Sequence, residues 1–532
     1  MARASWRVLA ALALASAAAT VALVWDGTQY PGPGLYGDGA GYLGAAESFA
    51  EHGTLRIPFA NYDSADSTSV LSQWPPAFSI ALSVPLRAGA DPMTAIRLVQ
   101  AIAGACTIGL TVVLVGAVTA PAWGAVAAVV LLATDSITGV HLNAVSEPLY
   151  ILCLAIALWG MVRDPDRPLT YGLAAAASAL VRYLGTAAIL GAGVWAMLQP
   201  GSTRMRAQRT AVAVLPGLVV ATAWRTYFRW AGGIARPLHA DHQVGAALRQ
   251  LLGATAAWLA PWDLGGAGSS RMAHGAQAGF KLVFGVAIVA LLAGEVRAAI
   301  AARRGETLHG GVAGEGGDAS GARLVAACVL LTACHLAALM VARLLYSDVA
   351  FYDRVLAPVH YLLAVGVIVL VASRWRAVSP PLRAGLAALV VVWLVGAATA
   401  TTRLVRTATT TGLDHANTGE RQGATISWLR ANGPGVPIYT NEPAKIFYHL
   451  GRDSRSLPWI LDADTVRALE RALRARPGMV VWFTGGTAAS YVAPDLLPRA
   501  STPAKLEGAL PLSVVSRGND GVVWELAPRV GP

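Results

Sequence analysis

Long apolar runs are the feature that most restricts how this chain of 532 residues can fold. A helix needs about 17–25 apolar residues to cross a bilayer, and eleven runs approach or reach that length. We expect membrane spans at 6–25, 93–118, 121–139, 144–162, 169–184, 185–198, 210–230, 279–301, 324–346, 355–373 and 384–403. Only 13% of the residues are charged. The chain is therefore predicted to be a polytopic α-helical membrane protein that contacts the lipid bilayer along most of its length.

Two of these segments have a second interpretation. The first run follows Arg3 and Arg7, as in a cleaved signal peptide, but it continues to Trp25 and is about 20 residues long, which favours an uncleaved span. Residues 169–198 have the length of two short spans, whereas one long tilted span would change the number of crossings.

The distribution of arginines predicts the orientation of the spans. With the N-terminus in the cytoplasm, the inside segments are 1–5, 118–121, 163–168, 199–209, 303–323 and 374–383, and all but the short second one contain arginine. The first outer loop, 26–92, holds seven acidic residues against Arg56 and Arg87. This positive-inside pattern predicts a multi-pass protein of the cell (plasma) membrane with an extracytoplasmic C-terminus. The net charge of +11 therefore reflects membrane topology, and we expect no nucleic-acid partner.

The composition changes near residue 404, where long apolar runs give way to short alternating elements. We expect helices at 420–432, 443–450 and 465–476, and strands at 436–440, 479–484, 512–516 and 521–526. The predicted organisation is a transmembrane domain, 1–403, whose first outer loop carries amphipathic helices, followed by a small extracytoplasmic α/β domain, 404–532. The four cysteines lie in apolar runs without a C-x-x-C pair, which is typical of small core residues.

The acid-rich first loop contains the strongest candidate for chemistry. Asp38 follows Gly37, and apolar side chains follow it at helical spacing, so we expect a helix that begins at Asp38 and lies on the membrane surface. Asp38 is interpreted either as a simple N-cap or as a general base, and helix amides favour the ionised carboxylate in both cases. Glu47 and Glu51 lie one turn apart and are expected to be solvated. Trp74, before two prolines, is expected to set the angle at which the chain re-enters the membrane.

Several ionisable residues fall near the predicted outer ends of the spans. They are Glu147, Arg182, Arg225, Arg229, Arg343 and Arg354, with His141 and Asn143 nearby. Each arginine could extend separately to the interface. The alternative is one anion site at the outer boundary, because guanidinium groups match phosphate oxygens. Asp353 could be only the ion-pair partner of its neighbour Arg354.

Histidines offer few candidate metal ligands. His239 and His242 flank Asp241 in a predicted outer loop, where solvated histidines are more common than metal ligands. His335 lies in the middle of a predicted span and is expected to be a hydrogen-bonded core residue. The sequence therefore indicates no firm metal site or cofactor, although a divalent cation is left as an option.

Several short motifs together resemble those of the GT-C-type integral membrane glycosyltransferases, especially the branch similar to protein O-mannosyltransferases and bacterial aminoarabinose transferases. The matching motifs are Gly37-Asp38 with Tyr42, Trp74-Pro75-Pro76, Asn143 with Ser146-Glu147-Pro148-Leu149, Ala179-Leu-Val-Arg182 and Asp353-Arg354-Val-Leu-Ala-Pro358. The resemblance covers about residues 1–400.

The resemblance implies an inverting transfer, on the outer face of the membrane, from a polyprenyl-phosphate-linked sugar donor to a hydroxyl of a glycan, lipid or protein acceptor. It implies Asp38 as general base and Arg354 with Arg182 as the clamp for the leaving lipid phosphate. We add Tyr42, Glu147, Arg225, Arg343 and Asp353 as candidate substrate-binding residues. Some relatives have a second acid after the aspartate, whereas Gly39 follows here, which weakens the case for a metal.

Two other functions fit a membrane protein with these features. A transporter or flippase of an anionic glycolipid would also need arginines at the membrane boundary, but such proteins tend to show internal repeats and polar groups at the bilayer midplane, which are not clear here. An assembly or sensor protein would have no specific need for Asp38.

Overall fold

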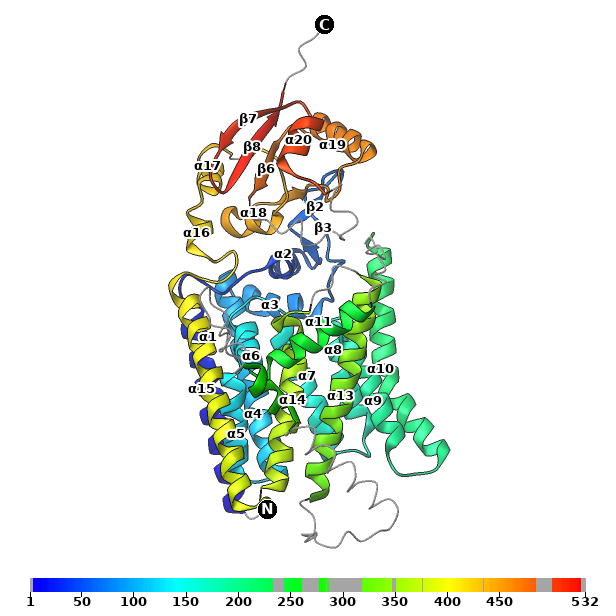
Figure 1. Ribbon diagram of the computed structural model, residues 1–532. Coiled ribbons are helices and arrows are strands. Elements are labelled where there is room, and N and C mark those ends of the chain that lie inside the picture. The colour runs from blue at the N-terminus through cyan, green and yellow to red at the C-terminus, as the bar shows by residue number, and fades with distance from the viewer. Residues whose placement is uncertain are drawn as a thin grey trace.

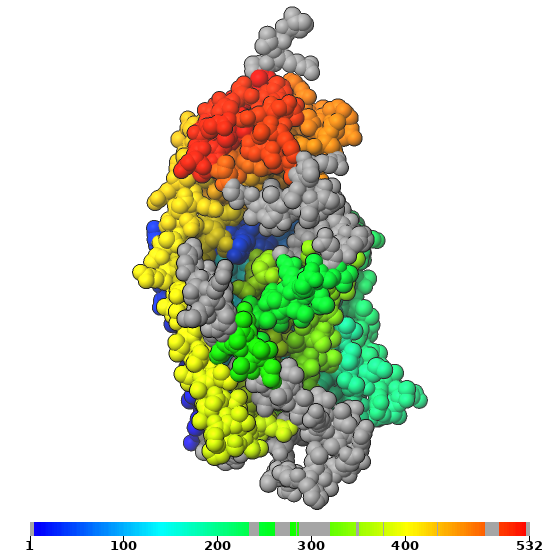
Figure 2. Space-filling model, viewed as in Figure 1, coloured from blue at the N-terminus to red at the C-terminus, as the bar shows by residue number. Residues whose placement is uncertain are grey.

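Figure 1 shows a helix bundle with a small sheet domain at one end and the N-terminus at the other. This computed structural model describes residues 3–232, 244–260, 277–283, 285–286, 318–346, 351–375, 377–433, 435–484 and 500–527. The space-filling view in Figure 2 shows the sheet domain stacked on the end of the bundle. The predicted fold class, a helical membrane protein with a small C-terminal α/β region, is confirmed.

Six described helices are long and apolar enough to cross a membrane by length and composition. They are α1 (Arg3–Gly27), α4 (Pro92–Val118), α10 (Thr203–Trp230), α13 (Asp318–Leu345), α14 (Asp353–Arg374) and α15 (Pro380–Thr410). The predicted span 121–139 is instead a broken pair, α5 (Pro121–Ala133) and α6 (Asp135–His141), bent by 71°. The break follows Thr134 and brings the polar Asp135 to the start of the second helix.

Four shorter helices also belong to the described part of the bundle: α7 (Glu147–Arg163), α8 (Pro168–Val181), α9 (Gly185–Leu198) and α11 (Val244–Ala257). The segment 169–198 forms two helices of 14 residues each, joined by a turn at 182–184, so the two-helix interpretation is confirmed. Most of the predicted span 279–301 lies outside the described residues. The prediction for His335 is confirmed, because its ring nitrogens contact the Leu331 carbonyl at 2.7 Å and the Tyr150 hydroxyl at 2.5 Å.

The first loop folds into α2 (Gly37–His52), β1 (Arg56–Ile57), β2 (Phe59–Asn61), β3 (Ser69–Val70) and α3 (Ala77–Arg87). Helix α2 lies between the bundle and the sheet domain and is buried over its first half (Figure 1). The Tyr42 ring packs on Phe78 and Trp74, and the Trp74 ring occupies the space that a Cβ at Gly41 would need. The expectation of a surface helix is therefore wrong for this half, because protein covers both sides of α2.

The described part of the C-terminal region contains five helices: α16 (Thr418–Arg421), α17 (Ala424–Asn432), α18 (Pro443–Leu450), α19 (Ala463–Ala475) and α20 (Pro503–Ala509). Its strands are β4 (Ile438–Thr440), β5 (Ser454–Ser456), β6 (Met479–Phe483), β7 (Leu512–Arg517) and β8 (Gly521–Leu526). The predicted elements are present, and the helix expected at 420–432 is split at Gly423. Strand β5 and helix α20 were not expected.

The sheet takes one strand from the first loop. Its order is β2-β5-β4-β6-β8-β7, and β2, β5, β4 and β6 are parallel. Phe59 of β2 pairs with Ser454 of β5, nearly 400 residues later in the chain. Residues of β6 alternate between two hydrophobic cores, with Val480 and Trp482 on one face and Val481 and Phe483 on the other. The sheet thus draws on both expected domains, and the loop that carries Asp38 is fastened to it.

Glu47 is in a different environment from the expected solvated one. Burial and the neighbouring charge of Glu51 raise the pKa of Glu47 to about 7. The folded state must therefore hold a carboxyl that resists ionisation, and its stability falls as pH rises from the ordinary glutamate range through about 7.

We expect Glu47→Gln to stabilise the protein at pH 8 and to have little effect well below the ordinary glutamate pKa of 4.5, where the carboxyl is largely neutral in both states. Thermal unfolding of the purified protein across this pH range checks the prediction. Glu51→Gln is the matched control, and we expect a smaller gain because it removes only the weaker of the two causes. Equal melting temperatures for Glu47→Gln and wild type at pH 8 would contradict the prediction.

Candidate functional site

Asp38 is the second residue of α2, and its side chain does not cap that helix. The helix begins at Gly37, Tyr36 holds the N-cap position, and no side-chain cap is formed. The Asp38 Oδ1 atom accepts a hydrogen bond from the neighbouring Gly39 amide at 3.2 Å, and both carboxylate oxygens accept from Arg354. The N-cap interpretation is therefore wrong, because Asp38 lies inside the first turn and its carboxylate pairs with Arg354.

Arg354 joins two carboxylates from different parts of the chain. It is the second residue of α14, and its Nε donates to Glu147 Oε1 at 2.7 Å. Its Nη1 donates to Asp38 Oδ1 at 3.1 Å, and its Nη2 donates to Asp38 Oδ2. The guanidinium also lies over the Tyr36 ring, 5.1 Å from the ring centre. Such a planar group, with donors on several edges, can hold two acids at once, which a lysine could not do in the same way.

Glu147 connects Arg354 to a second arginine. It is the first residue of α7, fully buried, and its Oε1 also accepts from Arg182 Nη1 at 2.6 Å. Arg182 lies in the turn between α8 and α9, where its Nη1 donates to the Ser146 hydroxyl at 3.2 Å. The Tyr42 hydroxyl donates to the same Ser146 oxygen at 3.2 Å. Five of the predicted site residues, Asp38, Tyr42, Glu147, Arg182 and Arg354, therefore converge, with Ser146 between them.

The four charged groups of this cluster are enclosed and balanced. The exposed fractions of the side chains are 15% for Asp38, 0% for Glu147, 18% for Arg182 and 13% for Arg354. Burial opposes ionisation of Asp38, but the Arg354 charge and hydrogen bonds, with the charge of Arg182, outweigh it. They hold the pKa of Asp38 below its ordinary value. Asp38 is therefore a carboxylate at neutral pH.

The other predicted binding residues lie outside this cluster. Asp353 is exposed, and Arg354 pairs with Asp38 and Glu147, so the expectation that Asp353 is only the partner of Arg354 is wrong. Arg225 is exposed on α10 near Tyr183. Arg343 is half-buried in the last turn of α13. Among the described residues, neither Arg225 nor Arg343 belongs to the ion pairs that join the cluster.

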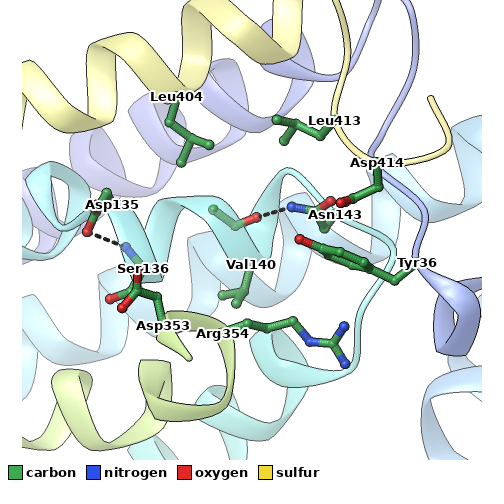
Figure 3. A pocket seen from close by; sticks show the side chains of 11 residues that line it. Tyr36, Asp135, Ser136, Val140, Asn143, Asp353, Arg354, Leu404, Leu413 and Asp414 are labelled. Carbon is green, nitrogen blue, oxygen red and sulfur yellow. Dashed lines mark hydrogen bonds between the residues drawn. The ribbon is translucent and has the colours of Figure 1, made fainter. Parts of the chain in front are cut away.

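A cavity of about 250 Å³ adjoins the cluster at Arg354 (Figure 3). Asp353, Tyr36, Asn143 and Arg354 line it, together with Asp135 and Asp414, which the sequence analysis did not select. Asp135 could have been noticed as an acid inside a predicted apolar span. Asp414 gave no such indication, because it follows the last span in a segment expected to be soluble.

The described residues provide no metal site. No group of three or more His, Cys, Asp or Glu side chains within them is arranged to hold a metal ion. His239, Asp241 and His242 lie outside the described residues.

Comparison with known proteins finds similar solved structures only. No family model matches the chain, and no curated protein matches its sequence. The chain is similar to ArnT from Cupriavidus metallidurans bound to undecaprenyl phosphate, with 15% identity over 100% of both chains and a TM-score of 0.44. It is similar to the Archaeoglobus fulgidus oligosaccharyltransferase, with 11% identity over 98% of this chain and 75% of that one and a TM-score of 0.47.

A third similar structure is the arabinofuranosyltransferase AftD from Mycobacteria, with 15% identity over 97% of this chain and 41% of that one and a TM-score of 0.47. These matches are to proteins of the kind that the sequence motifs resemble. With identities of 15% or less and TM-scores below 0.5, the function of this chain has to be inferred from its own residues.

Glu147 is the buried centre of the charge cluster, so its removal should be costly. Both arginines donate to Oε1, so Glu147→Gln can keep an acceptor oxygen there, but it removes the negative charge and leaves the two guanidinium groups undercompensated. We expect a loss of about 3–5 kcal/mol in the free energy of unfolding, which is typical when one partner of a buried ion pair is removed. Denaturant or thermal unfolding in detergent measures this loss.

Asp464→Asn is the control for this prediction. It breaks the Arg467–Asp464 pair, in which the Asp464 side chain is 90% exposed. Exposed pairs contribute about 0–1 kcal/mol, so this variant should unfold like wild type. If Glu147→Gln is as stable as Asp464→Asn, the cluster does not depend on Glu147 for charge balance.

Proposed function

We propose that this protein is an inverting glycosyltransferase that moves a sugar from a polyprenyl-phosphate-linked donor to an acceptor hydroxyl on the outer face of the membrane. The observation that carries the proposal is the convergence of Asp38, Glu147, Arg182 and Arg354 beside a cavity, at the end of an apolar helix bundle. A carboxylate and two guanidinium groups are the components needed for transfer with a phosphate leaving group.

The donor that we propose has two parts that suit this location. Its polyprenyl chain is compatible with the apolar helices, whereas its phosphate needs cationic donors near the membrane boundary. Arg354 and Arg182 supply fixed N–H groups of the kind that binds phosphate oxygens in pairs. We propose a cytoplasmic N-terminus and an extracytoplasmic sheet domain from the distribution of arginines. The first loop and the sheet domain share the end of the bundle opposite the N-terminus (Figure 1).

In the proposed reaction, the acceptor hydroxyl attacks the anomeric carbon from the side opposite the phosphate. The acceptor O–H bond breaks and its proton passes to an Asp38 carboxylate oxygen. A new bond forms between the acceptor oxygen and the anomeric carbon, and the bond between the anomeric carbon and the phosphate oxygen breaks. The electron pair leaves on the lipid phosphate, where the Arg354 and Arg182 charges stabilise it.

Arg354 connects the proposed base, Asp38, with the proposed binding site for the donor phosphate. While it donates to Asp38, it lowers the affinity of that carboxylate for a proton, so it weakens the base. A donor phosphate that accepts hydrogen bonds from Arg354 reduces this effect. Binding of the donor therefore makes Asp38 a better base at the moment when an acceptor proton has to be removed.

We expect Asp38→Asn to abolish sugar transfer, because the amide cannot accept the acceptor proton, while donor binding is retained. The measurement is transfer of radiolabelled sugar from undecaprenyl phosphate carrying single hexoses or pentoses, by purified protein in nanodiscs, with donor breakdown recorded. Glu47→Gln is the matched control, since it neutralises another carboxyl of the same helix outside the charge cluster and should transfer at the wild-type rate.

Two results would contradict the transferase proposal. Asp38→Asn with wild-type transfer would remove the proposed base. Binding of the lipids without any cleavage of the sugar–phosphate bond, in wild type and variant alike, would favour the transporter or flippase.

The acid limb of the pH–rate profile offers a second test. The Arg182 charge contributes to the low pKa of Asp38, so Arg182→Gln should raise that pKa. The base is then protonated at a higher pH, and we expect the acid limb of kcat/KM to move to higher pH, with a raised donor KM. Arg209→Gln, which breaks an ion pair with the largely exposed Asp166, is the control and should leave the profile unchanged. An acid limb at the same pH in Arg182→Gln would exclude Asp38 as the titrating base.

A further inference from the structure

The cavity beside Arg354 has a composition that the proposed chemistry does not explain. Three carboxyl groups line it, from the break between α5 and α6 (Asp135), the start of α14 (Asp353) and the turn after α15 (Asp414). Figure 3 shows Asp135 and Asp353 toward one end of the cavity and Asp414 near the other. We call it the acidic cavity.

These carboxyls lack the cationic partners that neutralise the neighbouring cluster. No described residue forms an ion pair with Asp135, Asp353 or Asp414, although Arg354 lies in the same wall. Asp135 Oδ1 accepts only from the Ser136 amide, at 2.7 Å, and the buried Asp414 Oδ2 has no hydrogen-bond partner among the described residues. Burial raises the pKa of Asp414 to about 6, although a hydrogen bond with the Tyr36 hydroxyl and the charges of His415 and Arg354 act in the opposite direction.

Asn143 gives an independent indication that the cavity is a binding site. Its side chain is only 7% exposed, and its Nδ2 donates to the Gly139 carbonyl at 2.7 Å, which leaves Oδ1 as a buried acceptor without a partner in the described part of the chain. A Cβ at Gly34 would lie 1.9 Å from Oδ1, so glycine is required there for the amide to occupy this position. Figure 3 shows the Asn143 side chain beside Asp414 and Tyr36.

The cavity therefore presents many hydrogen-bond acceptors and few free donors. The Ser136 hydroxyl is hydrogen-bonded to the His360 ring at 2.8 Å, and Arg354 is committed to Asp38 and Glu147. Val140, Leu404 and Leu413 supply apolar wall between the polar groups. A ligand that fits must bring several donors on a small frame with apolar C–H faces, and carboxylates bind hydroxyl donors more strongly than neutral acceptors do.

We propose that the acidic cavity binds one sugar ring of the reaction through its hydroxyl groups. The ring is either the sugar of the donor or the terminal sugar of an acceptor, and this inference rests on the proposed transferase function. The volume of about 250 Å³ is below the range of roughly 300–1,000 Å³ for drug-sized ligands, which suits a single ring rather than an oligosaccharide. Arg354 lies in the wall, so the bound ring adjoins the cluster proposed to hold the phosphate.

Asp135→Asn and Asp414→Asn test this proposal with little change of shape. Asp414 has a φ of 48°, a left-handed conformation that asparagine also tolerates, so the backbone should be kept. Full-length proteins in nanodiscs are compared without acceptor for their affinity to undecaprenyl phosphate carrying a single hexose or pentose and to undecaprenyl phosphate itself. The ratio of the two affinities isolates the contribution of the sugar.

If the cavity holds the donor sugar, each variant should lower this ratio about tenfold while the affinity for bare undecaprenyl phosphate stays unchanged, because a hydrogen bond to a charged acceptor is replaced by a weaker one. If it holds an acceptor sugar, the ratio stays at the wild-type value and the acceptor KM rises about tenfold in the transfer assay. Asp166→Asn is the control, and it should change neither quantity. Asp166 is largely exposed and lies just beyond the end of α7 opposite Glu147.

The proposal is overturned if both the ratio and the acceptor KM stay within twofold of wild type in both variants. It is also overturned if bare undecaprenyl phosphate loses as much affinity as the sugar-bearing lipid. Failure of the transferase function gives a different result, namely no Asp38-dependent transfer from any lipid. In that case an unchanged ratio alone overturns the sugar site.

Discussion

Buried charges must be compensated, and at the end of the bundle next to the sheet domain Arg354 provides most of that compensation. It donates to Asp38 from the first loop and to Glu147 at the start of α7, and Glu147 in turn holds Arg182 between α8 and α9. The cluster therefore joins four segments that are far apart in the sequence. Its contribution to net stability need not be large, because desolvation offsets the attraction, but the loss of any one member leaves another charge uncompensated. This requirement fixes the relative positions of the helix ends and of α2.

Helix α2 is held from both sides, which makes the position of Asp38 depend on both parts of the protein. Below it, Tyr42 packs on Phe78 of α3 and belongs to one core with Ile96 of α4. Above it, Ala444 of α18 joins the same core, and β2 of the same loop is an edge strand of the sheet. The sheet domain is thus bound to the loop that carries Asp38 by strand pairing as well as by side-chain packing. A displacement of the sheet domain would therefore move α2 and with it Asp38.

Local features of this protein could be predicted from its sequence, whereas features that depend on distant partners could not. Apolar runs predicted the long helices, and the motifs at Asp38, Glu147, Arg182 and Arg354 predicted residues that the structure brings together. Strand β2 is three residues long and pairs with a strand almost 400 residues away, so no local pattern identifies it. Asp38 could be interpreted as an N-cap because the spacing of residues along α2 does not show that Arg354 of α14 pairs with its carboxylate. Glu47 was expected to be solvated because its burial depends on tertiary packing.

The distribution of charge also explains why a phosphate and a sugar would bind at different sites in the proposed reaction. The cluster contains two carboxylates and two guanidinium groups, so it is neutral before any ligand binds. The acidic cavity on the other side of Arg354 has three carboxyls without cationic partners among the described residues. An anionic lipid phosphate is repelled by those carboxyls and attracted to the guanidinium groups, whereas sugar hydroxyls can donate to the carboxyls. In the proposed reaction, electrostatics would therefore place the lipid phosphate at the arginines and a sugar ring, of the donor or of the acceptor, toward the acids, with Arg354 at the boundary between the two sites.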